Sequence, residues 1–348
     1  MDSSRPRLPI VLVVQFALVL ASCALLFAAA ALACLTVEDD PQLAISKAAL
    51  EQLKHVGFGR AEIFETARNL AAVESEGCWG GATGNFDEQR LSVGIAQFNV
   101  GRSTLQPLLK DYQSKLGARF DDTLAARMPL YGKKLFSRAC LAQTADGTFK
   151  PQRECYDFLE SVQTNHKLDS MFKQEIDALF ETRDMRQVQL DELVKRMTSV
   201  VDDIKRLFPR RAATYRDMMW AVDMKVQQGD VPGKERTFPD DKDILRVRTK
   251  YEQLTEQQRT TELLNILHWY DGLCRFVDQD GVRYDCDYNK QKWEKRITLG
   301  VAPEQQDLLL LTHLRSRVAR TKAGLYQADC FQRRARIILG VGSVHGTH

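Results

Sequence analysis

The sequence lacks the short motifs that mark several common kinds of enzyme. Its 348 residues contain no His-Glu-x-x-His, no Gly-x-Ser-x-Gly and no Walker phosphate-binding loop. This argues against a zinc protease, an α/β-hydrolase and a P-loop NTPase. No two cysteines have the close Cys-x-x-Cys spacing of a zinc site, and the glycines of 340–346 have the wrong spacing for a dinucleotide-binding loop. Neither a metal nor an organic cofactor is therefore expected.

The sequence also lacks a strong net charge, internal repeats and low-complexity tracts. A formal charge of +3 is too small to indicate a nucleic-acid-binding protein, so no nucleic-acid partner is expected. Basic residues nevertheless cluster near the C-terminus. Such a cluster most often forms a solvated helix face, and the alternative is a surface that faces an anionic polymer. The residues concerned are Arg315, Arg317, Arg320, Lys322, Arg333, Arg334 and Arg336.

Charge is absent from one long stretch near the N-terminus. No charged residue lies between Arg7 and Glu38, and residues 8–37 are almost wholly apolar, which exceeds the roughly 20 residues that a spanning helix needs. Arginines precede the stretch and acidic residues follow it, so the positive-inside rule places the N-terminus in the cytoplasm. We expect residues 1–37 to anchor the protein in the inner membrane as a single-pass protein with a periplasmic or extracellular body. Ala31-Leu32-Ala33 resembles a signal peptidase site, so a cleaved signal and secretion are the alternative.

The cysteines fit an exported protein. Six of the eight lie in the body of the chain, and an even number in an exported chain favours disulfides. Short separations favour Cys140–Cys155 and Cys274–Cys286 as local bridges. That choice leaves Cys78 to pair with Cys330.

Hydrophobic periodicity predicts a mainly helical, all-α body over residues 41–346. Apolar residues recur at three-to-four spacing, and strand-like alternation is confined to short pieces near 91–98. The Pro- and Gly-containing stretch 229–241 is the best candidate for a loop between two lobes. Helices are predicted at about 45–56, 61–75, 104–116, 168–207, 212–228, 251–276, 304–326 and 330–339.

Glu74 continues the apolar stripe of the predicted helix 61–75, so its carboxyl should face the interior or a cleft. Desolvation favours the protonated form of a carboxyl, which is what a general acid near neutral pH needs. A carboxyl at a helix end is nonetheless commonly a surface group. Glu76 lies past the stripe and next to Gly77, where exposure is expected.

Asp87 follows Glu74 by thirteen positions, beyond a glycine-rich turn. Two carboxyls on opposite sides of a cleft are the basic apparatus of glycoside hydrolysis, in which one protonates the leaving oxygen and the other activates water or stabilises charge. The alternative is that Asp87 caps its own turn.

Three segments of the sequence resemble blocks of a known protein family. Residues 84–109, GNFDEQRLSVGIAQFNVGRSTLQPLL, are similar to a signature of lysozyme-like proteins that bind or cleave peptidoglycan and are related to chitosanases, lytic transglycosylases and goose-type lysozymes. The segment WAVDMKVQQG, residues 220–229, resembles a second block of that family, and RRARIILGVGSVHG, residues 333–346, is a weaker third. The resemblance implies a two-lobed lysozyme-like fold with a small irregular β region.

The resemblance also implies roles for individual residues. The catalytic glutamate would be Glu74, with Glu76 as its rival, and Asp87 would be the second carboxylate. Gln97 would line the cleft, and Asn99 belongs to the same Gly-x-x-Gln-x-Asn motif. The sequence departs from the pattern at Glu88 and Arg90, where relatives have glycines.

Three further residues are candidates for substrate binding. Asp223 and Gln227 lie four positions apart at the edge of a helical apolar stripe, where they either bond a sugar or are simply solvated. Trp79 either stacks on a sugar ring or serves the core.

The leading hypothesis is an enzyme that cleaves β-1,4 bonds of peptidoglycan as a muramidase or lytic transglycosylase. A chitosanase is the alternative enzyme, and an inactive, membrane-tethered peptidoglycan-binding or scaffold protein is the alternative from another class.

Overall fold

The computed structural model describes residues 34–85, 89–209, 211–228, 241–274, 282–319 and 324–344. Almost all of the apolar stretch 8–37 and of the predicted inter-lobe loop 229–241 lies outside these ranges. Within them, no helix is both long enough and apolar enough to cross a membrane. Residues 1–35 and 36–348 separate into two units, and the second begins with Thr36 paired to Cys78 and with Val37 donating its N–H to the Gly77 carbonyl.

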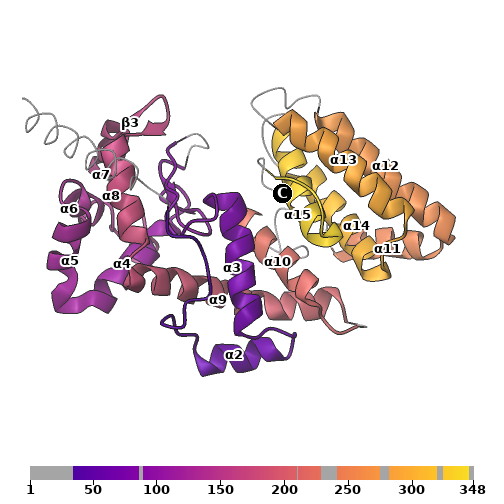
Figure 1. Cartoon of the computed structure of the whole chain (residues 1–348), viewed down its shortest axis with the longest axis horizontal. Coiled ribbons are helices and arrows are strands. Elements are labelled where there is room, and N and C mark those ends of the chain that lie inside the picture. Colours follow the sequence, from indigo (N-terminus) through magenta and orange to yellow (C-terminus); the bar gives the residue numbers. More distant parts are fainter. Residues whose placement is uncertain are drawn as a thin grey trace, which may run out of the picture. The chain divides into compact units, whose positions relative to one another are not determined.

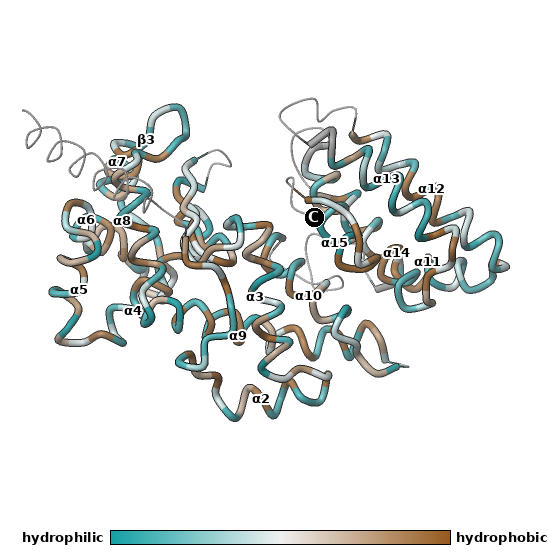
Figure 2. The backbone as a smooth tube through the Cα atoms, in the orientation of Figure 1, coloured by the Kyte–Doolittle hydropathy of each residue, from teal (hydrophilic) through white to brown (hydrophobic). Residues whose placement is uncertain are grey.

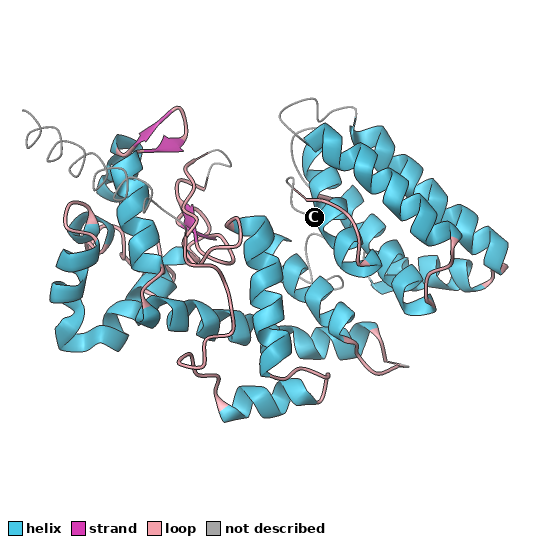
Figure 3. Cartoon of the chain, in the orientation of Figure 1, coloured by secondary structure: helices cyan, strands magenta, loops and turns pink. Residues whose placement is uncertain are grey.

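The described chain is mainly helical, as predicted, with two short antiparallel strand pairs (Figures 1 and 3). Ser92 lies opposite Asn99 in the first pair, and Gln163 lies opposite Leu168 in the second. The strands are β1 (Ser92–Val93), β2 (Phe98–Asn99), β3 (Gln163–Thr164) and β4 (Lys167–Leu168). The helices are α2 (Lys47–Lys54), α3 (Arg60–Glu74), α4 (Leu105–Leu116), a 3₁₀ turn η1 (Gly117–Arg119), α5 (Phe120–Arg127), α6 (Gly132–Leu135), α7 (Arg153–Ser161), α8 (Ser170–Phe180), α9 (Arg183–Leu207), α10 (Tyr215–Gln228), α11 (Asp241–Glu252), α12 (Glu256–Cys274), α13 (Val282–Thr298), α14 (Pro303–Arg317) and α15 (Leu325–Leu339).

Local chemistry explains several helix ends. The Ser46 hydroxyl accepts the N–H of Ala49 at the start of α2, and the Asp169 carboxylate accepts two N–H groups at the start of α8. Pro303 opens α14, where its missing N–H costs nothing. Gly340 ends α15 in the left-handed conformation, with φ of +68°, and its N–H bonds back to Arg336.

Two predicted helices are wrong in extent. The span 168–207 is two helices, α8 and α9, because the backbone at Thr182 is extended and breaks the helical hydrogen bonding. The span 304–326 ends at Arg317, and α15 starts only after Gly324, whose φ of +83° cannot belong to a right-handed helix. Periodicity continues across both breaks, so it could not reveal them.

Helix α9 packs against α2, α3, α4 and α10, and α15 packs against α10, α12 and α14. Hydrophobic and hydrophilic residues both recur along these helices (Figure 2). This arrangement places the end of α3, the middle of α10 and the middle of α15 close together, which sets up the site described below.

The two local disulfides predicted from spacing, Cys140–Cys155 and Cys274–Cys286, are both formed. The predicted Cys78–Cys330 bridge is wrong. Cys78 is disulfide-bonded, as is Cys34, whereas Cys330 is a buried thiol whose pKa is raised by burial. Cys34 lies in the apolar stretch 8–37, so the spacing of the six cysteines of the body could not predict its bridge.

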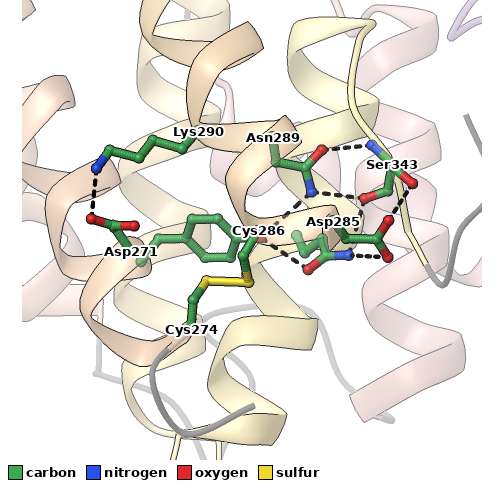
Figure 4. The surroundings of a disulfide bond; sticks show 9 residues. Asp271, Cys274, Asp285, Cys286, Asn289, Lys290 and Ser343 are labelled. Atoms are coloured by element: carbon green, nitrogen blue, oxygen red, sulfur yellow. Dashed lines mark hydrogen bonds and ion pairs between the residues drawn. A yellow bond between two sulfur atoms is a disulfide. The ribbon is translucent and has the colours of Figure 1, made fainter. Parts of the chain in front are cut away.

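A buried polar network fixes the C-terminal segment against α13 and α15 (Figure 4). Asn289 accepts the N–H of Ser343 and donates its amide to the Ser343 carbonyl, while the Ser343 hydroxyl bonds Asp285. Gln332 donates to the same carbonyl and to Asp285. The residues just before Ser343 are thereby held in place, including Gly340, Val341 and Gly342.

His313 of α14 should make the fold sensitive to acid. Burial, followed by the charge of Arg317, lowers the pKa of His313 to about 4 from 6.5, and the ring packs 4.6 Å from Trp269. The unfolded chain therefore binds a proton more readily than the folded chain, and stability falls as pH drops from 6.5 to about 4. We expect His313→Gln to remove roughly 2–3 kcal/mol of this acid-dependent loss. Urea unfolding of wild type and variant at pH 7 and pH 4 measures the difference, and parallel pH profiles would contradict the prediction.

Candidate functional site

Glu74 is the last residue of α3, and its side chain is 13% exposed. The stripe that predicted its direction is buried as expected at Ile63, Ala67 and Leu70. The helix stops because the Ser75 hydroxyl bonds the Cys78 carbonyl and the Gly77 N–H returns to Ala71. The carboxylate of Glu74 is thus held at the edge of the core.

Arg333 of α15 binds Glu74 and Asp223 at the same time. Its Nη2 lies 2.5 Å from Glu74 Oε1 and 2.6 Å from Asp223 Oδ1, and its Nε lies 3.0 Å from Asp223 Oδ1. Burial lowers the pKa of Arg333, but the attraction of Asp223 and Glu74 outweighs burial and raises the pKa well above its ordinary value. The guanidinium therefore stays charged between two carboxylates.

Arg334 extends this network to Gln227. It donates to Gln227 Oε1 at 2.8 Å and to the Cys330 carbonyl at 2.8 Å, and its Nε lies 3.3 Å from Asp223 Oδ2. Gln227 in turn donates to Asp329. Asp223 and Gln227, predicted as a sugar-binding or solvated edge of α10, instead hold α10 to the buried arginines of α15.

The predicted solvated face is therefore wrong at Arg333 and Arg334, whose side chains are 4% and 0% exposed. The helical phase of α15 contains a signal of this burial. Arg334 lies three positions after Phe331 and four before Ile338, and both are fully buried. The helical phase that identified Glu74 would thus have placed Arg334 on the buried stripe of α15.

A cavity of about 780 Å³ opens beside this network. Asp223 and Arg333 line it, together with Val73, which precedes Glu74 in the chain. The other lining residues come from α3, α10 and the residue before it, α13, α15 and the segment after α15: Glu65, Asn69, Leu70, Thr214, Tyr215, Arg216, Met219, Tyr288, Arg336, Ile337, Gly340, Val341 and Gly342. Glu74 itself is not one of the lining residues, so the cavity reaches its chain neighbour Val73 and its ion-pair partner Arg333.

The phenol of Tyr215 is a further polar group of this cavity. Burial, followed by the charge of Glu65, raises the pKa of Tyr215, so the phenol stays protonated at neutral pH. Its oxygen is buried and makes no hydrogen bond of ordinary geometry to a described residue, although Thr66 and Asn69 lie near it. The phenol ring stacks 5.2 Å from Phe58.

The other two predicted catalytic residues, Glu76 and Asp87, are not part of the described network. Glu76 is exposed in the turn after α3, with φ of +55°. Asp87 and Glu88 lie outside the described residues, so the second carboxylate has no position here. Arg90 is paired with Glu160 on the surface.

Gln97 lies in the turn between β1 and β2 and Asn99 ends β2, and neighbouring residues of the same segment occupy polar groups of both side chains. Gln97 accepts the Thr83 hydroxyl at 2.9 Å and donates to the Gly81 carbonyl at 3.1 Å. Asn99 accepts the N–H of Arg102. These contacts indicate that both side chains stabilise the local backbone around β1 and β2.

Trp79 is fully buried, with Arg186 lying 6.0 Å from its ring centroid. The buried ring has no face available to a sugar. Trp79 therefore packs in the core, which was the second of the two roles expected for it.

Close packing explains the glycines of this loop. A side chain at Gly84 would collide with the backbone of His166 in the β3–β4 hairpin, and one at Gly94, where φ is +83°, would collide with Gln189 of α9. Gln189 is itself fully buried and donates to the carbonyls of Trp79 and Phe180. The glycines therefore let the loop press against neighbouring elements.

Within the described ranges, no three His, Cys, Asp or Glu side chains are grouped to hold a metal ion. Comparisons of the chain with protein-family models, with curated proteins and with solved structures found no match.

Proposed function

We propose that this protein binds and cleaves the β-1,4-linked glycan strands of peptidoglycan. The proposal rests on the resemblance of residues 84–109 to lysozyme-like proteins, and on the expectation that the helical body has the two lobes of that fold. The single structural observation that supports it is the position of Glu74, a partly exposed carboxylate next to a cavity large enough for sugar rings. The N-terminal apolar stretch would tether the body to the inner membrane, facing the wall polymer.

Glu74 would protonate the oxygen of the glycosidic bond. In the present arrangement its carboxylate is ion-paired with Arg333, so this role requires that the bound sugar open the pair and that Glu74 take up a proton. Once Glu74 has given up that proton, Arg333 stabilises the carboxylate that forms. If Asp87 faces the cleft, it would activate water; otherwise a hydroxyl of the sugar itself closes the product, as in a lytic transglycosylase.

The same ion pair favours one other function, a glycan-binding protein that does not cleave. Arg333 and Asp223 are both almost fully buried, which suits a permanent structural contact better than a catalytic group. A chitosanase is less well supported, because three arginines line the cavity and would repel a cationic polymer.

The products of the reaction distinguish these functions. Full-length protein in detergent is incubated with peptidoglycan and, separately, with chitosan, and the soluble products are analysed by mass spectrometry. We expect peptidoglycan fragments with either anhydro ends, from transglycosylation, or reducing ends, from hydrolysis. Sedimentation with peptidoglycan without any product would instead identify a binding protein, and products from chitosan alone would identify a chitosanase.

A further inference from the structure

The segment that follows α15, residues 340–343, contributes to the wall of the cavity, and we call it the strap. Gly340, Val341 and Gly342 of the strap all line the cavity, as does Ile337 on the last turn of α15. The strap leaves the helix at Gly340, where the backbone turns with φ of +68°. The position of the strap therefore sets the shape of this part of the cavity.

One face of α13 holds the strap by hydrogen bonds. Asp285, Asn289 and Trp293 lie four positions apart, so their side chains project from the same side of the helix. Asn289 accepts the N–H of Ser343 at 2.6 Å and donates to the Ser343 carbonyl at 2.7 Å, and the Ser343 hydroxyl bonds Asp285 (Figure 4). Trp293 Nε1 donates to the carbonyl of Val341 at 2.6 Å. None of these three α13 side chains lines the cavity itself.

Gly342 allows the strap to lie directly on α13. Its φ of +135° is one that residues with a side chain rarely adopt. A Cβ at this position would lie 2.9 Å from Asn289 Oδ1 and 2.9 Å from Trp293 Nε1. These are atoms that bond the strap, so a side chain at Gly342 would push the strap away from the groups that hold it.

The strap adds apolar surface to the cavity. Val341 lies in the lining beside Ile337, and the ring of Tyr288, which precedes Asn289 on α13, is part of the same lining. Ligand pockets combine such surface with a few polar groups, and the C–H face of a sugar ring can pack against it. A glycan in the cavity would therefore contact the strap by packing.

The strap is separated from the proposed acid. Arg333, which binds Glu74, and Gly340 are seven positions apart along α15, which corresponds to about 10 Å along the helix axis. A glycan with its scissile bond at Glu74 would meet the strap away from that bond. The strap should consequently affect how tightly the glycan binds more than how fast the bond is cut.

We propose that the strap positions the glycan chain in the cavity, and that Asn289 and Trp293 are positioning residues that act on the substrate through it. This deepens the proposed function, on which the identity of the glycan rests. Two residues of α13 that do not line the cavity would thus control the affinity for the substrate, because they fix the wall against which the sugar packs.

Gly342→Ala displaces the strap and leaves its anchoring side chains in place. Binding of the peptide-bearing tetrasaccharide of peptidoglycan to the full-length protein is measured by calorimetry, in a Glu74→Gln background that should prevent cleavage. We expect the Kd to rise about tenfold, a factor typical of the loss of one well-packed contact. With Glu74 present, KM should rise by a similar factor while kcat stays within about twofold of the wild type.

Gly300→Ala is the matched control. Gly300 follows α13 and also has a positive φ, of +98°, but a Cβ there meets no atom within 4 Å and the residue does not line the cavity. Its affinity should equal that of the parent protein. Asn289→Ala removes both bonds to the Ser343 backbone and should weaken binding, whereas Ser343→Ala keeps those bonds and should weaken it less. Thermal unfolding verifies that each variant is folded.

The indole N–H of Trp293 reports the position of the strap independently of affinity. The chain has four tryptophans, and the NMR signal of this indole is identified by its absence in Trp293→Phe. We expect the signal to shift in Gly342→Ala and on addition of the tetrasaccharide to the parent protein. The signal of Trp79, which is buried and does not line the cavity, should stay in place.

A shifted Trp293 signal with unchanged affinity in Gly342→Ala would overturn the positioning role and leave the proposed cleavage standing. An unshifted signal in that variant, or an equal loss of affinity in Gly300→Ala, would overturn it as well. Affinity that depends on the strap without any products from peptidoglycan would uphold the positioning role and overturn cleavage. Absence of binding to the parent protein at millimolar tetrasaccharide would overturn the positioning role.

Discussion

Replacing Arg333 with Met is expected to lower the free energy of unfolding by about 3–5 kcal/mol, because removal of one partner strands buried charge. Arg333 is 4% exposed and holds Asp223, which is 3% exposed, and Glu74, which is 13% exposed. In the variant, Asp223 keeps Arg334 but Glu74 loses its cation. Urea denaturation at pH 7 measures the change. Arg153→Met, at a site that is 90% exposed, is the control and should change stability by less than about 0.5 kcal/mol.

A double variant identifies the cause of that loss. In the Arg333→Met background, Glu74→Gln removes the stranded carboxylate and should restore part of the stability, by about 0.5–3 kcal/mol. In the wild-type background the same change should not stabilise the protein, because Glu74 there has its partner. Loss of less than about 1 kcal/mol in Arg333→Met, or additive effects in the double variant, would show that the ion pair contributes little to the fold.

Glu74→Gln should reduce the rate of glycan cleavage by about 10²–10⁴-fold, the range that a positioned general acid contributes. The amide has nearly the same shape and can still accept a hydrogen bond from Arg333, but it cannot donate a proton as an acid. The rate of release of soluble fragments from peptidoglycan measures the effect. Binding to peptidoglycan should be preserved, because the substitution leaves the cavity lining unchanged.

Glu76→Gln is the matched control for this experiment. Glu76 lies two positions away, is exposed, and makes the turn after α3 with φ of +55°, which Gln can adopt as well as Glu. Its cleavage rate should stay close to that of the wild type. Loss of activity in Glu76→Gln with a normal rate in Glu74→Gln would show that the assignment of the acid is reversed, and equal rates in all three proteins would exclude both residues.

Patterns that repeat over a few residues predicted the local features correctly. Periodicity located α3 and its buried stripe, and the predicted end of the helix at residue 75, just before the stop signal Gly77, is one residue beyond the observed end at Glu74. Separations of 15 and 12 residues identified the Cys140–Cys155 and Cys274–Cys286 bridges. The alternation near 91–98 corresponds to β1 and β2.

Patterns of this kind failed where the partner is distant in the chain. Glu74 and Arg333 are 259 positions apart, and nothing in either neighbourhood indicates the other. The basic cluster suggested a solvated face, because most such clusters are exposed, yet the packing of α15 against α10 buries Arg333 and Arg334. The predicted pairing of Cys78 with Cys330 was wrong for a different reason, because Cys34, which is also disulfide-bonded, lies in the stretch predicted to span the membrane.

The sequence by itself determined the mainly helical class, the end of α3 to within one residue and the two local disulfides. These depend on side-chain periodicity and backbone preferences that act within one or two helical turns. Only the tertiary structure decided that Glu74, Asp223 and Gln227 share a buried network with Arg333 and Arg334, and that Arg216 and Arg336 meet at one cavity. Those groupings depend on which helix faces pack together, and burial then requires that each charge there find a partner.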